Sequence, residues 1–117
     1  MVGIHSMTDF RNSESWNQAR FAICAVLEFA EAWSRRIEYR SLAKNIEHLS
    51  VAVLDNIAKG YEGTGNKTFL KKAEQSIRRL ENELHRVHRK GALKQSDATL
   101  LKLNLDSVKA SLTNLER

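Results

Sequence analysis

The sequence of 117 residues contains no proline, and this absence constrains the fold more than any other feature. Proline breaks helices and punctuates turns, so a chain without it favours long helices joined by other turn residues. We therefore do not expect an all-β or loop-rich architecture. A chain of this length can bury one hydrophobic core without disulfides or metals. We expect a single domain over residues 13–117, preceded by a flexible leader over residues 1–12 that lacks apolar periodicity at its start.

Apolar residues recur every three or four positions in four segments of the sequence, which is the spacing of one helix face. These segments cover residues 13–36, 39–59, 67–90 and 96–117. In the last segment the stripe consists of Leu101, Leu105, Val108, Leu112 and Leu115. Four amphipathic helices with short connections, in a chain without strand signals, predict an all-α, up-and-down four-helix bundle.

Capping residues mark the ends of these segments. Ser13 is the expected N-cap of the first helix and Ser96 that of the fourth, because a serine oxygen accepts from the free N–H groups of a first turn. Gly60 and Gly91 are expected to end the second and third helices. Residues 60–66 hold three of the five glycines, but they form no Walker sequence and follow no strand, so we interpret them as an interhelical turn and not as a phosphate-binding loop.

Cys24 is the only cysteine, so the chain can form neither an internal disulfide nor a cysteine-based zinc site. It lies in the apolar run from Phe21 to Leu27, and we expect it to be a small buried residue in a cytoplasmic protein. That run is the longest apolar stretch and is far too short to span a bilayer. We expect no contact with membranes.

Leu100 and Leu103 lie off the apolar stripe of the fourth helix. A helix that is apolar on more than one side must bury a second face. The two leucines therefore either form a subunit interface or widen the contact of this helix with the core.

Charge is concentrated in one part of the chain. Residues 67–94 contain nine Lys or Arg and three Glu, a balance of +6, whereas the remaining residues contain ten basic and eleven acidic side chains, a balance of −1. At about 100° per residue, the basic side chains of the third helix lie opposite its apolar stripe and should face solvent. We call this set the basic face; it consists of Lys67, Lys71, Lys72, Arg78, Arg79, His85, Arg86, Arg89 and Lys90.

A helix face of nearly one sign repels itself, because helix surfaces normally mix signs to form pairs four residues apart. Nucleic acid would relieve this repulsion, since Lys and Arg that neutralise phosphates release condensed counterions. The basic face has no interleaved aromatic side chains, so we expect recognition of the phosphate backbone and not base stacking. A solvated face or a face that docks a partner protein is the alternative.

Catalytic groups do not converge in this sequence. His85 and His88 are three residues apart, which differs from the His-Glu-x-x-His zinc pattern, and no third ligand is evident. Neither a Ser/His/Asp nor a Cys/His arrangement can be argued. We expect no metal, no cofactor and no enzymatic activity, and we interpret Trp16 and Trp33 as core or interface residues.

Several motifs resemble the four-helix-bundle proteins encoded by intervening sequences of bacterial 23S rRNA genes, over residues 10–115. They begin with Phe10-Arg11 followed by Trp16 and Ala19, and continue with Asn56-Ile57-Ala58-Lys59-Gly60. The third helix adds Phe69, Ala73, Ser76, Ile77, Leu80, Glu81 and Leu84, followed by Gly91. The chain departs from the family pattern at Lys59 and Arg79, where glutamate is usual, and at Ala52-Val53-Leu54, where Ser-Ile-Pro is usual.

This resemblance implies a homopentamer of bundles with an electropositive surface and no known catalysis. The accessory variability proteins of diversity-generating retroelements share the fold, pair with a reverse transcriptase and bind nucleic acid. The changes at Lys59 and Arg79 each replace an acid with a base and so favour this accessory type. Two hypotheses follow: an oligomeric protein that binds nucleic-acid phosphates, or a protein-interaction module such as an accessory subunit of a reverse transcriptase.

Overall fold

The computed structural model describes residues 13–61 and 67–116, and nearly all of them are helical. Four long helices follow one another: α2 (Glu14–Ser34), α3 (Arg40–Tyr61), α4 (Lys67–Arg89) and α5 (Gln95–Glu116), with a short 3-10 turn, η1 (Ile37–Tyr39), between α2 and α3. The all-α prediction is confirmed. No helix in these two ranges is long and apolar enough to cross a membrane.

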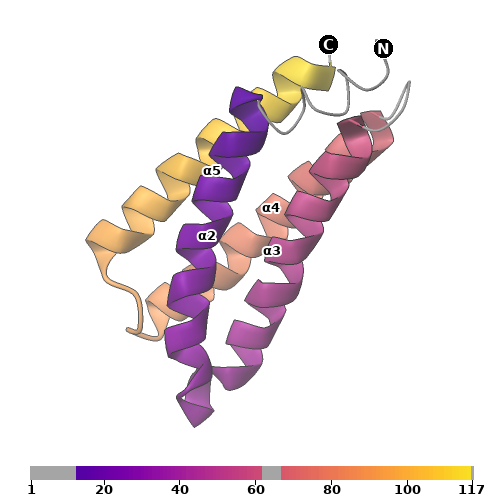
Figure 1. Cartoon of the computed structure of the whole chain (residues 1–117). Helices are drawn as coiled ribbons and strands as arrows, with labels where there is room; N and C mark the ends of the chain where they lie inside the picture. Colours follow the sequence, from indigo (N-terminus) through magenta and orange to yellow (C-terminus); the bar gives the residue numbers. More distant parts are fainter. Residues whose placement is uncertain (1–12, 62–66, 117) are drawn as a thin grey trace.

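The helices run alternately up and down the long axis of a body measuring 51 × 22 × 21 Å (Figure 1). Helix α2 packs against α3 and α5, and α4 packs against the same two helices. Each helix therefore has two neighbours and one outward face, as in the predicted bundle. The outward face of α4 carries the basic residues described below.

Two of the four predicted helix ends are confirmed and two are wrong. The Ser13 hydroxyl accepts from the Trp16 backbone N–H at 3.1 Å, and Gly91, two residues after the end of α4, has a φ of +89°. Helix α3, however, continues through Gly60 to Tyr61, because one glycine in a helix costs only about 1 kcal/mol and Tyr61 packs against the core. Helix α5 begins at Gln95, so Ser96 lies inside its first turn and is not its cap. The predicted leader and most of the glycine-rich turn lie outside the described residues.

All four helices contribute to one hydrophobic core. Its largest fully buried side chains include Ile23, Ile46, Ile57, Ile77, Leu80, Leu105 and Leu112. Trp33 is also buried, and its indole N–H donates to the Ala92 carbonyl at 3.3 Å, whereas Trp16 is half-buried against the core. The Tyr39 hydroxyl donates to the Lys90 carbonyl at 3.2 Å. These two bonds fasten the turn that follows α4 to the region where α2 ends and α3 begins.

Cys24 and Leu115 do not occupy the positions that the sequence suggested. Cys24 is exposed, because the apolar run that contains it extends around α2 while only residues such as Ala22, Ile23 and Val26 face the core. Leu115 is 39% exposed, because it lies in the last turn of α5, beyond Leu112, the last fully buried leucine of the stripe. Apolar composition alone therefore overestimated burial at both sites.

Candidate nucleic-acid interface

Helix α4 separates apolar and charged side chains onto opposite sides. Its buried residues are Leu70, Ala73, Ile77, Leu80, Leu84 and Val87, spaced three or four apart. This spacing places them on one stripe that packs against α3 and α5. Most of the positions between them are exposed to solvent.

The nine residues of the basic face are all exposed. Eight of them belong to α4 itself, and Lys90 follows at its C-terminal end. Because α4 is a continuous helix of 23 residues, which rises about 1.5 Å per residue, the cations are distributed along roughly 35 Å of one surface. Arg86 and Arg89 also lie at the negative end of the helix dipole, where positive charge is stabilising.

Few anions neutralise this surface. Of the eight Lys and Arg residues of the basic face, Arg86 alone forms an ion pair within the described residues, with Glu83 at 3.3 Å. Lys72 lies over the Phe69 ring, 5.2 Å from its centroid. The remaining cations have no carboxylate within 4 Å among residues 13–61 and 67–115.

The three glutamates of α4 lie at its edges and engage neighbouring groups. Glu81 accepts a hydrogen bond from Lys109 of α5 at 2.8 Å, and Glu74 accepts from the Thr113 hydroxyl at 3.1 Å. Glu83 is largely buried and pairs with Arg86 as described. The acids of this helix are thus directed toward the bundle or its margin, and the solvent side remains positive.

Cations outside the basic face are paired more often. Within single helices, Lys59 pairs with Asp55 and Lys102 with Asp106, and Arg35, directly after α2, pairs with Glu31, all at 3.0–3.3 Å. Arg36 pairs with Glu38 at 3.1 Å near the start of η1. The rest of the protein follows the usual mixing of signs, so the basic face is an exception within the same molecule.

Two groups at the junction of α4 and α5 have shifted pKa values. Burial opposes the charge of Lys109, but hydrogen bonds and attraction from Glu81 and Asp106 outweigh it and raise the pKa of this ammonium above 10.5. Burial likewise opposes ionisation of Asp106, yet hydrogen bonds and attraction from Lys109 and Lys102 lower the pKa of its carboxyl below 3.8. Both groups are therefore charged at neutral pH. Lys109 joins α5 to α4 through Glu81, and Asp106 pairs with Lys109 within α5.

His85 and His88 lie close together on α4, with ring centroids 6.5 Å apart. No group of three or more His, Cys, Asp or Glu in residues 13–61 and 67–115 is arranged to hold a metal ion. His85 is an exposed member of the basic face and His88 is half-buried, and both line a pocket between α4 and α5. Sequence reasoning missed this pocket, because half of its wall comes from a different helix.

Leu100 and Leu103 are 57% and 58% exposed on α5. The interpretation that these two leucines widen the contact of α5 with the core is therefore wrong.

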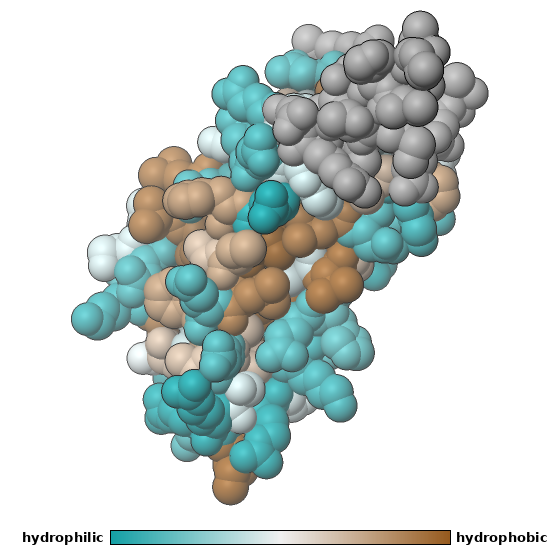
Figure 2. Space-filling view, viewed as in Figure 1, coloured by the Kyte–Doolittle hydropathy of each residue, from teal (hydrophilic) through white to brown (hydrophobic). Residues whose placement is uncertain are grey.

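A further apolar side chain is exposed on the adjacent helix α2. Phe21 is 71% exposed and lines a groove with Asn104 of α5. Figure 2 shows apolar side chains distributed over α2 and α5 on the face in view. The exposed apolar side chains of α2 and α5 are therefore available for contact with a partner protein or with a second copy of this chain.

The chain matches no protein-family model, no curated protein and no solved structure. Its resemblance to the intervening-sequence proteins stays a prediction.

Proposed function

We propose that this chain is a non-enzymatic, oligomeric four-helix-bundle protein of the bacterial cytoplasm that binds nucleic-acid phosphates through the basic face of α4. One observation carries the proposal: seven of the eight Lys and Arg residues on this face lack an ion pair within the described residues. A polyanion whose negative charges follow one another along a line would neutralise these cations and so stabilise the surface. The phosphates of a nucleic-acid backbone are arranged in this way.

The binding would be driven by counterion release. Each phosphate that a cation neutralises frees condensed ions, so the logarithm of the affinity falls linearly with the logarithm of salt concentration, by about 0.9 per phosphate for duplex DNA. Five to seven contacts along α4 would give a slope of about −4.5 to −6 for duplex DNA. Contacts of this kind carry no sequence information.

Titration of labelled single-stranded and duplex RNA and DNA at several salt concentrations tests this proposal. We expect binding that is strong at low ionic strength, weakly dependent on sequence, and lost steeply as salt increases. Absence of binding to all four nucleic acids at low ionic strength would contradict the proposal and favour a face that docks an acidic protein surface.

The oligomer is the second part of the proposal. Exposed Leu100 and Leu103 would be buried between subunits, and a pentamer, the assembly implied by the family resemblance, would repeat the basic face five times and raise the avidity for a long polyanion.

Light scattering tests the oligomer and should give a mass near 67 kDa, which is five times the 13.4 kDa of one chain. Replacement of both leucines with serine should shift the mass toward the monomer. Ile37→Ser, which removes an apolar side chain that is 83% exposed in η1, is the matched control. A wild-type monomer at micromolar concentration would contradict this part.

A further inference from the structure

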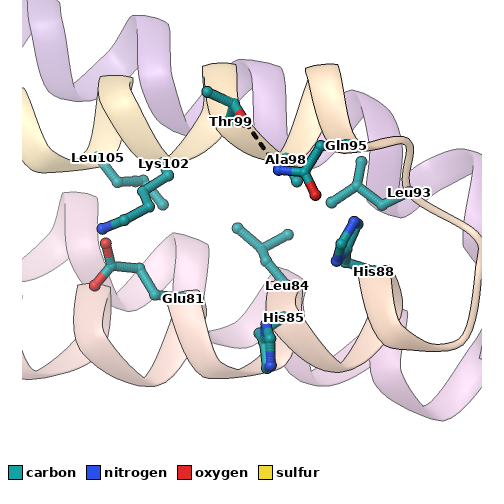
Figure 3. Close-up of a pocket in the computed structure, with 10 residues that line it drawn as sticks. All are labelled: Glu81, Leu84, His85, His88, Leu93, Gln95, Ala98, Thr99, Lys102 and Leu105. Carbon is teal, nitrogen blue, oxygen red and sulfur yellow. Dashed lines mark hydrogen bonds between the residues drawn. The ribbon is translucent and has the colours of Figure 1, made fainter.

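A pocket of about 410 Å³ opens between α4 and α5 near the turn that joins them (Figure 3). Its volume lies within the range of small-ligand sites. The apolar part of its wall consists of Leu84, Leu93, Ala98 and Leu105. The polar part consists of Glu81, His85, His88, Gln95, Thr99 and Lys102. A pocket that combines apolar walls with polar groups able to fix an orientation is typical of a small-molecule site.

The polar groups come from both helices that form the opening. The Gln95 side-chain amide donates to the Thr99 hydroxyl at 3.1 Å, which leaves the amide oxygen free to accept another bond. Figure 3 shows Leu84 and His88 directed from α4 toward α5, with His88 facing Gln95 across the opening. An imidazole ring and a leucine can contact the flat face of a ring, while an amide and a hydroxyl can contact its edge.

The pocket adjoins the basic face. His85 belongs to both. Arg78 precedes His85 by seven residues and Arg89 follows it by four, and both separations are close to whole helical turns, so the two arginines lie on the same side of α4 as His85. A line of cations therefore leads along α4 to the mouth of the pocket. Lys102, which is 67% exposed on α5, lies on the opposite rim, where its ammonium pairs with Asp106 at 3.3 Å.

We infer that this pocket receives one base of a single-stranded nucleic acid whose phosphates lie along the basic face. The inference rests on the proposed function and extends it to the strandedness of the ligand. Bases of a duplex are stacked and paired, so they cannot enter such a pocket without being flipped out. Proteins that bind single strands commonly combine a cationic track with surfaces that take up bases.

Base binding in this pocket goes beyond the recognition of the phosphate backbone that the sequence of α4 predicts. The basic face of α4 presents no aromatic side chains on which bases could stack. The packing of α5 against α4, however, forms a base-sized space that neither helix sequence indicates by itself.

Three probes with the same number of phosphates separate the base from the backbone: a single-stranded oligonucleotide, an abasic strand of the same length, and a duplex with the same total number of phosphates. We expect the strand with bases to bind about 5- to 10-fold more tightly than the abasic strand, a ratio at the low end of reported per-base stacking contributions. Thr99→Leu, which narrows the pocket without changing charge, should abolish this preference. It should leave the affinity for the abasic strand unchanged.

Ala110→Leu is the matched control, because it adds bulk to an exposed position of α5 outside the pocket. Gln95→Leu is a second pocket variant at an exposed position and should also reduce the preference. Equal affinity of the wild type for the abasic strand and the strand with bases would overturn the pocket inference and leave the proposed function standing. So would a preference that survives both pocket variants. Failure of all three probes to bind at low salt would overturn the proposed function itself.

Discussion

Replacing Arg78, Arg79, Arg86 and Arg89 with glutamine is expected to lower the affinity for nucleic acid by about 100- to 1,000-fold at 0.1 M salt. At this salt concentration each phosphate contact contributes about 1 kcal/mol through counterion release. Three or four lost contacts therefore account for the expected change. The slope of the logarithm of affinity against that of salt should become shallower by about 3 to 4. Fluorescence anisotropy over a series of salt concentrations measures both quantities.

The matched control carries four substitutions outside the basic face: Arg20, Arg35, Arg40 and Lys44 to glutamine. These side chains are exposed on α2 and α3 or follow α2 directly. Both variants have 15 basic and 14 acidic residues, a net charge of +1 in place of +5. The control should lose much less affinity and keep most of the salt slope. Equal losses in the two variants would show that binding follows net charge and not the position of the charge, which would exclude the basic face as the interface.

The basic face could be predicted from the sequence because its geometry is local. Within one helix, the positions of the buried residues fix which side faces solvent, whatever the neighbouring helices do. Leu70, Ile77 and Leu84 define the buried side of α4, and all nine residues assigned to the opposite side are exposed. The same reasoning correctly separated Leu100 and Leu103 from the stripe of α5.

The groups between helices could not be predicted, because they depend on the register of one helix against another. Nothing in the spacing of α4 indicates that Glu81 meets Lys109, which is 28 residues away. The pocket between α4 and α5 also depends on this register.

Ser50 is a core residue that the sequence did not reveal, for a different reason. It is fully buried at a stripe position of α3, and its hydroxyl has no hydrogen-bond partner in the described part of the chain. A hydropathy pattern places a serine outside the core.

Lys109→Met is expected to destabilise the bundle by about 2–3 kcal/mol, below the 3–5 kcal/mol typical of a fully buried pair. The Lys109 and Glu81 side chains are 24% and 21% exposed, and Glu81 Oε2 is already buried without a hydrogen-bond partner in the described residues. Removal of the ammonium leaves the Glu81 charge uncompensated between two helices. Urea denaturation of the variant and the wild type measures the difference.

Lys102→Met is the matched control, because it removes an ammonium from the same helix that is 67% exposed and should cost less than about 1 kcal/mol. Replacing Lys109 and Glu81 together with methionine should restore much of the lost stability, since an apolar pair of similar volume needs no compensating charge. Equal losses for Lys109→Met and Lys102→Met would contradict a special role for the pair.

The pH dependence of the Lys109→Met effect gives an independent test. The pKa of Lys109 is raised in the folded protein, so its contribution is fully present below its ordinary value of 10.5 and is lost as the pH rises through the folded value. The pKa of Asp106 is lowered, so the part that depends on this carboxylate is present above 3.8 and is lost as the pH falls through the folded value. The stability difference between wild type and variant should therefore be constant near neutral pH and diminish at both extremes. A difference that is unchanged at either extreme would mean that methionine acts there through packing and not through the loss of charge.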